Sequence, residues 1–240
     1  MREQDSRTAM LLGEDAVEKL RGSRVAVFGI GGVGGHLCES LVRAGVGAID
    51  LFDNDTVSVS NLNRQLVALH STLGEPKVDA MRARLLDIDP TCQVRAVRAF
   101  YLPENADQYP LDEYDYIADA IDTVSAKLEL AVRADRLGIP IISAMGAGNR
   151  TDPTRFAVTD IFKTEGCPLA RVMRRELKAR GIKHLKVVFS DEPSVKPRQI
   201  GGDAQSAEKK TVPGSLSFVP SAVGLIMARE IVFDLIHKTV

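Results

Sequence analysis

The sequence predicts an α/β protein built on a Rossmann-like, doubly wound and mostly parallel sheet. From Val25 to Ser143, short apolar runs typical of buried strands alternate with segments of helical periodicity, and the loops between them are short. A glycine-rich turn joins the first apolar run to the first helix. Beyond Asp152 and Pro153 this alternation changes, which predicts a mixed C-terminal extension within one 240-residue domain.

The first unit of this pattern is a strand, a glycine-rich turn, a helix and a second strand. The strand at residues 25–28 leads into Gly29, Gly31 and Gly34, which have G-x-G-x-x-G spacing, and the second strand ends on Asp53. Such glycines let the backbone approach a phosphate at a helix N-terminus. A carboxylate about 20 residues further on can bind ribose hydroxyls. The unit therefore predicts a nucleotide site, but it leaves the nucleotide open.

Cations close to this unit favour a triphosphate. The run Ser60-Asn61-Leu62-Asn63-Arg64-Gln65 follows the second strand, and Lys77 begins the next predicted helix, which extends to about Ile88. Arg64 and Lys77 are close enough in sequence to flank one phosphate chain. Phosphate chemistry depends on such neutralisation of charge.

Asp122 is a candidate magnesium ligand. We expect a buried strand over residues 116–122, which places Asp122 at its carboxyl end, where open α/β sheets bind ligands. Magnesium takes one or two carboxylates together with phosphate oxygens. Capping of the helix predicted from Ser125 is the alternative role, and the two are compatible.

The composition narrows the class of protein. A net charge of −1 excludes a globally basic nucleic-acid binder, and the sequence has neither an 18-residue apolar span nor a signal peptide. We therefore expect a cytoplasmic protein without a membrane partner. The three cysteines form no C-x-x-C pair, which excludes a four-cysteine zinc site.

The segment 163–211 is predicted to hold a basic helix and a mobile loop, before an apolar helix from Ser221 to about His237. Between residues 163 and 198 there are ten Lys or Arg against four Asp or Glu. The helix 168–180 carries four cations at i, i+3, i+4 and i+7, namely Arg171, Arg174, Arg175 and Lys178. A solvated face is the simpler reading, but this local excess favours contact with a polyanion such as RNA.

In order and spacing, the glycine-rich turn, Asp53, the 60–65 run, Lys77 and Asp122 resemble the adenylating enzymes related to ubiquitin activators. The resemblance implies ATP and Mg²⁺ as cofactors and a homodimer. It implies a catalytic role for Arg64, Lys77 and Asp122, and for Arg7, which lies in the helical lead-in 1–23 and would act on the partner subunit's triphosphate. A solvated terminal arginine is the alternative for Arg7. The implied nucleotide-binding residues are Gly29, Gly31, Gly32, Gly34, Asp53, Ser60, Asn61, Arg64, Lys77, Asp122 and Thr123.

Within this superfamily, three further segments resemble the bacterial tRNA threonylcarbamoyladenosine dehydratases. They are residues 143–150, 168–175 and 214–220. The branch implies tRNA as substrate, with its threonyl carboxylate adenylated and the ring then closed by the carbamoyl nitrogen. Activation of a ubiquitin-like or sulfur-carrier protein is the alternative, and an NAD-binding oxidoreductase or nucleotide sensor is a third possibility that the charged residues disfavour.

Two features remain open at this stage. The second glycine-rich loop, residues 144–150, could line the substrate pocket, hold a monovalent cation through its carbonyls, or simply end a strand. Cys167 precedes the basic helix, where helix amides can lower the pKa of a thiol. A thioester-forming enzyme would need such a cysteine, whereas ring closure needs no enzyme nucleophile.

Overall fold

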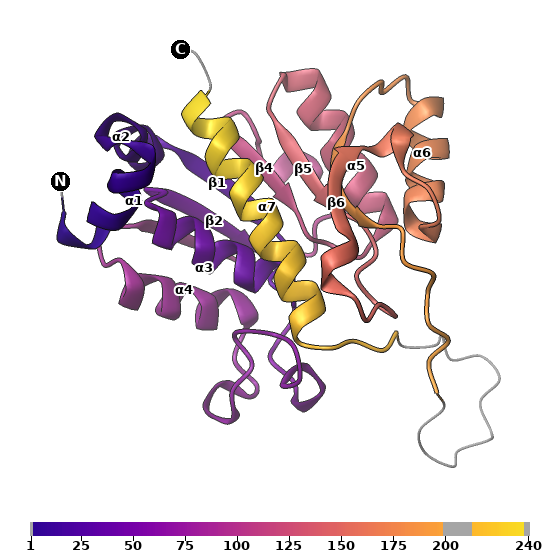
Figure 1. The fold of residues 1–240 in the computed structure, drawn as a ribbon, viewed down its shortest axis with the longest axis horizontal. Coiled ribbons are helices and arrows are strands. Elements are labelled where there is room, and N and C mark those ends of the chain that lie inside the picture. The colour runs from indigo at the N-terminus through magenta and orange to yellow at the C-terminus, as the bar shows by residue number, and fades with distance from the viewer. Residues whose placement is uncertain (1, 199–212, 238–240) are drawn as a thin grey trace.

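The structure, a computed structural model, describes residues 2–198 and 213–237 and is organised around one seven-stranded sheet (Figure 1). The strand order is β3-β2-β1-β4-β5-β7-β6. All neighbouring strands are parallel except β6 and β7, which are antiparallel. The predicted fold class is thereby confirmed. The strands are β1 (Arg24–Phe28), β2 (Ala48–Phe52), β3 (Gln93–Val97), β4 (Tyr116–Asp119), β5 (Ile141–Ala144), β6 (Phe156–Asp160) and β7 (Lys186–Ser190).

Helices cover both faces of the sheet. One face of the sheet is packed against α3, α4 and α7, and the other face against α5 and α6 (Figure 1). Helices α1 and α2 form the N-terminal part of the chain, before β1. Short 3-10 turns occupy several of the connections. The helices are α1 (Ser6–Leu12), α2 (Glu14–Gly22), α3 (Gly34–Ala44), α4 (Lys77–Ile88), α5 (Val124–Leu137), α6 (Pro168–Ala179) and α7 (Phe218–His237).

Three boundaries differ from those predicted. Strand β4 ends at Asp119 rather than at residue 122, because the Asp119 carboxylate accepts a hydrogen bond from the Ile121 amide at 3.2 Å and turns the chain. The alternation of residues 93–100 predicts a strand over that whole range, but β3 ends at Val97. Helix α7 begins at Phe218, three residues before the predicted start.

The residues 184–189 predict a strand within the segment 163–211, beside the basic helix and the loop, and the structure has it as β7. This strand lies inside the sheet, between β5 and β6, and is parallel to β5. Residues 199–212 of the predicted mobile loop lie outside the described residues. No described helix is long and apolar enough to span a membrane.

Helix α7 packs closely on α3 because its Gly224 has no side chain. A Cβ atom at this position would lie 2.4 Å from the Val33 carbonyl oxygen and 3.0 Å from the Leu37 amide nitrogen. At the start of the same helix, Pro220 lies against Gly32 of the glycine-rich turn. The C-terminal helix therefore supports that turn directly.

We predict that Gly224→Ala destabilises the protein by about 1–3 kcal/mol, as overpacking of a well-packed contact usually does. Denaturant unfolding measures this change. Gly22→Ala is the matched control, since a Cβ there meets no atom within 4 Å. Equal stability of the two variants would contradict the close packing of α7 on α3.

Candidate functional site

The glycine-rich turn at the end of β1 is shaped by two close backbone approaches. Gly29 has φ +91°, and a Cβ on it would lie 2.6 Å from the Ala120 carbonyl oxygen. A Cβ on Gly34 would lie 1.8 Å from the Gly29 carbonyl oxygen, so only glycine lets α3 start here. The N-cap of α3, Val33, makes no side-chain capping bond. This helix end can therefore offer backbone N–H groups to a phosphate.

Asp53 anchors this turn from the end of β2. Its two carboxylate oxygens accept hydrogen bonds from the Ile30 amide at 2.7 Å and the Asp55 amide at 2.8 Å. Burial raises the pKa of Asp53, and the nearby Lys77 ammonium opposes that rise. The carboxylate thus shapes the turn, a role that the sequence did not indicate beside the expected contact with ribose.

Lys77, the first residue of α4, is buried at this edge and forms an ion pair with an aspartate. Its ammonium lies 2.7 Å from Asp55, whose side chain is 59% exposed. The backbone bridge between Thr56 and Pro76 holds the two segments together. Sequence reasoning missed Asp55, because a charged residue in a loop belongs to no periodic pattern.

The 60–65 run forms a compact turn beside the glycines. The Asn61 side chain accepts a hydrogen bond from the Ser58 amide at 3.1 Å, while the Ser60 side chain is exposed. Arg64 is half-buried, and its guanidinium donates to the Ser60 carbonyl at 3.0 Å. Asn63 donates to the Ser215 carbonyl at 3.0 Å, which ties this run to the segment before α7.

Asp122 and Thr123 lie on the loop between β4 and α5. The Asp122 side chain is exposed, and the Thr123 hydroxyl is 3.4 Å from it. Thr123, rather than Asp122, is the N-cap residue of α5, and it makes no side-chain capping bond. Within residues 2–198 and 213–237, no three His, Cys, Asp or Glu side chains are grouped as metal ligands.

The second glycine-rich loop follows β5 and is fastened to the segment before α7. Asn149 has φ 58°, its amide donates to the Gly214 carbonyl at 2.8 Å, and its side chain accepts from the Gly214 amide at 2.7 Å. Arg150 is buried, and its Nε and Nη1 atoms have no hydrogen-bond partner among the described residues. Cys167 lies against this loop, since its sulfur would be 3.8 Å from a Cβ on Gly146.

Two groups of predicted site residues, on α1 and on α6, lie away from the loops described above. Arg7 is exposed on α1, beside Met10 and Leu11, which are 81% and 87% exposed. On α6, Arg171, Arg175 and Lys178 are exposed, but Arg174 is half-buried and donates to the Thr164 carbonyl at 2.7 Å. Arg174 therefore has a structural contact that the i, i+3, i+4, i+7 pattern did not indicate.

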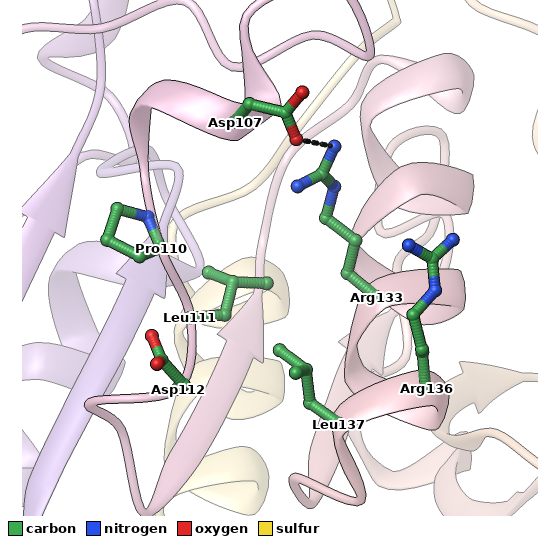
Figure 2. Close-up of a pocket in the computed structure, with 7 residues that line it drawn as sticks. All are labelled: Asp107, Pro110, Leu111, Asp112, Arg133, Arg136 and Leu137. Carbon is green, nitrogen blue, oxygen red and sulfur yellow. Dashed lines mark ion pairs between the residues drawn. The ribbon is translucent and has the colours of Figure 1, made fainter.

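The remaining predicted site residues lie in the loops that follow the parallel strands. They gather at one edge of the sheet because the carboxyl ends of parallel strands lie on the same side. Strand β1 has β2 on one side and β4 on the other, so the turn after β1 lies where the strand order reverses. Ligands of open α/β sheets bind at this reversal. A separate cavity of about 280 Å³ lies between α5 and the loop before β4 and contains the Asp107–Arg133 ion pair (Figure 2). None of its lining residues was predicted as a site residue.

The fold and the site define a nucleotide-binding α/β protein in which a glycine turn is supplemented by a buried lysine and a neighbouring arginine. The chain belongs to the ThiF family, whose model matches residues 5–239. The resemblance to the adenylating superfamily is thereby confirmed.

Relatives of known activity match most of the chain. It is 46% identical over 243 residues to the tRNA threonylcarbamoyladenosine dehydratase of Bacillus subtilis, covering 98% of this chain and 96% of that protein. The dehydratase of Escherichia coli, solved with ATP, superposes with a TM-score of 0.89 at 36% identity and covers 99% of this chain and 95% of that one. The molybdopterin-synthase adenylyltransferase of Escherichia coli is 35% identical over 147 residues, which cover 61% of this chain and 58% of that protein.

We predict that none of the three thiols reacts quickly in the native protein. Cys38, Cys92 and Cys167 are all buried and free, and burial raises the pKa of Cys38 and that of Cys92, the latter to about 11. A thiol-specific reagent at pH 8 should find three thiols only after denaturation. If one thiol of the native protein reacts quickly, and this reaction is lost in Cys167→Ser, the result would favour a thioester-forming enzyme.

Proposed function

We propose that this protein uses ATP to dehydrate N6-threonylcarbamoyladenosine at position 37 of tRNA. The observation that carries the proposal is the Lys77–Asp55 pair, which places a buried cation beside the turn proposed to hold the phosphates. The dehydratase relatives match nearly the whole length of the chain. A dinucleotide site has no evident need for that cation.

The first step is formation of an acyl-adenylate. The threonyl carboxylate attacks the α-phosphorus of ATP, the bond to the β-phosphate oxygen breaks, and pyrophosphate leaves. The turn at Gly29, Gly31, Gly32 and Gly34 would hold the phosphates, and Lys77 and Arg64 would neutralise the charge that develops on them. Asp53, Ser60, Asn61 and Thr123 complete the proposed nucleotide contacts.

The second step is ring closure. The carbamoyl nitrogen attacks the activated acyl carbon, loses its proton, and AMP leaves with the carboxyl oxygen, so that one water is lost overall. Both reacting groups belong to one side chain, and closure gains from their proximity. No enzyme nucleophile is required, which agrees with the buried state of Cys167.

Asp122 is the proposed magnesium ligand. Its carboxylate is exposed on the loop after β4, and a magnesium ion with one protein carboxylate can complete its coordination with phosphate oxygens and water. When bound, such an ion would offset triphosphate charge. A monovalent cation on the carbonyls of residues 144–150 stays a prediction.

A homodimer would give the exposed α1 helix a function. Met10 and Leu11 are large apolar side chains with most of their surface exposed, which is typical of a contact surface. Arg7 lies one turn before them, and a contact through this helix would let Arg7 reach the partner subunit's nucleotide site.

RNA is proposed to contact the exposed side of α6 through Arg171, Arg175 and Lys178, with Arg174 supporting the helix through Thr164. Glu176 pairs with Arg175 and Arg180 and reduces the local charge. The alternative function, adenylation of a ubiquitin-like or sulfur-carrier protein, has its support in the shorter match to the molybdopterin-synthase adenylyltransferase. A carrier or sulfur-transfer protein stays a possible partner on that ground.

The proposal is tested by nucleoside mass analysis of tRNA that carries threonylcarbamoyladenosine, after incubation with the protein, ATP and Mg²⁺. We expect an ATP-dependent loss of one water. Lys77→Met should lower the rate by about 100-fold or more, the scale of removing one electrostatic stabiliser. Arg82→Met, an exposed cation on the same helix, is the control.

Competent tRNA that keeps its mass would contradict the proposal. Pyrophosphate exchange stimulated instead by a small protein ending in Gly-Gly would establish the carrier alternative. Normal turnover by Lys77→Met would remove that lysine from the mechanism.

We predict that Arg171→Gln with Arg175→Gln weakens tRNA binding and leaves ATP affinity unchanged. Log affinity falls as log salt concentration rises, and each lost phosphate contact should make this fall shallower by about 0.7–0.9. Arg82→Gln with Arg136→Gln is the matched control, since it removes equal charge from exposed positions on α4 and α5. If tRNA affinity falls equally in the two double variants, the effect comes from the net charge of the protein and not from a specific contact of α6 with RNA.

A further inference from the structure

Three polar side chains form a fully enclosed network beneath the loop that carries Asp122. The Lys127 ammonium, from the first turns of α5, lies 2.9 Å from Asp119 Oδ2 and 3.2 Å from Ser143 Oγ. The Ser143 hydroxyl donates to the same Asp119 oxygen at 2.5 Å. Lys127, Asp119 and Ser143 are 0% exposed. The network joins the ends of β4 and β5 to α5.

The same carboxylate holds the neighbouring loop. Asp119 Oδ1 accepts the Ile121 amide at 3.2 Å, one residue before Asp122. At the other end of the loop, the Lys127 amide donates to the Thr123 carbonyl at 3.1 Å. Between Asp119 and Ile121, the Ala120 carbonyl oxygen is the atom that a Cβ on Gly29 would strike. A shift of this loop would therefore disturb both Asp122 and the glycine turn.

Stability alone gives a weak reason for this arrangement. Burying an ammonium and a carboxylate costs free energy, and apolar residues of similar volume often replace such a pair without loss. The lysine also lies near the N-terminus of α5, the end where a positive charge is disfavoured. A buried pair with defined hydrogen bonds does, however, fix the direction of the groups attached to it.

We infer that Lys127 is a positioning residue that acts through Asp119 to orient the Asp122 carboxylate toward the magnesium–triphosphate group. The inference rests on the metal role proposed for Asp122. Partners of metal ligands commonly contribute about 10- to 100-fold to metal affinity or activity. Lys127 would do so without touching nucleotide or metal.

The test compares the Mg²⁺ concentration for half-maximal ATP–pyrophosphate exchange in full-length variants. We expect Lys127→Met to raise it about 10- to 100-fold, with a smaller change in the KM for ATP at saturating Mg²⁺. Lys127→Met with Asp119→Asn removes the unpaired buried charge and should recover much of the stability lost in the single variant. Its Mg²⁺ requirement should stay high, because the ammonium that fixed residue 119 is still absent.

Recovery of both stability and normal Mg²⁺ dependence in the double variant would overturn the inference and assign the pair a structural role only. Asp122→Asn is the reference variant. If it leaves the Mg²⁺ dependence unchanged, the metal role of Asp122 fails and the inference fails with it. If Asp122→Asn shifts that dependence and both Lys127 variants do not, only the inference fails.

Discussion

The close approach of helix α3 to the end of strand β1 is the contact on which the rest of the site depends. It exists because Gly34 has no Cβ atom, and any other residue at position 34 would push the helix away from the strand. The approach aims the uncapped helix end at the edge of the sheet, where it can meet a phosphate. Asp53 fixes the intervening turn by accepting the Ile30 amide. The end of α3 and the turn held by Asp53 therefore meet at the same edge of the sheet.

Two lysines are buried near this edge, and their partners differ. Lys77 pairs with Asp55, which is largely exposed, so an incoming phosphate can compete for the ammonium without leaving a buried carboxylate unpaired. Lys127 pairs with Asp119, which is enclosed, so a phosphate cannot replace this carboxylate as the partner of the ammonium. The first arrangement suits ligand binding, and the second suits the maintenance of geometry.

Much of the fold could be predicted from periodicity and turn chemistry. The glycine spacing, the βαβ alternation and the change after Pro153 all reflect local rules. The Asp119–Lys127 pair could not be predicted, because a lysine at this helical position looks solvent-exposed until the helix is docked on the sheet. The same limit hid Asp55 and the contact of Arg174 with Thr164, since each depends on a partner remote in sequence or in an aperiodic loop.

The contact of Gly224 with Val33 also bears on the order in which the protein matures. The glycine turn leaves a ribosome well before the helix that supports it, because the strands β2 to β7 lie between them in the chain. A nascent chain therefore carries a complete glycine motif before it has the helix that supports that motif. That support is in place only after α7 has been made, and a chain truncated before α7 lacks it.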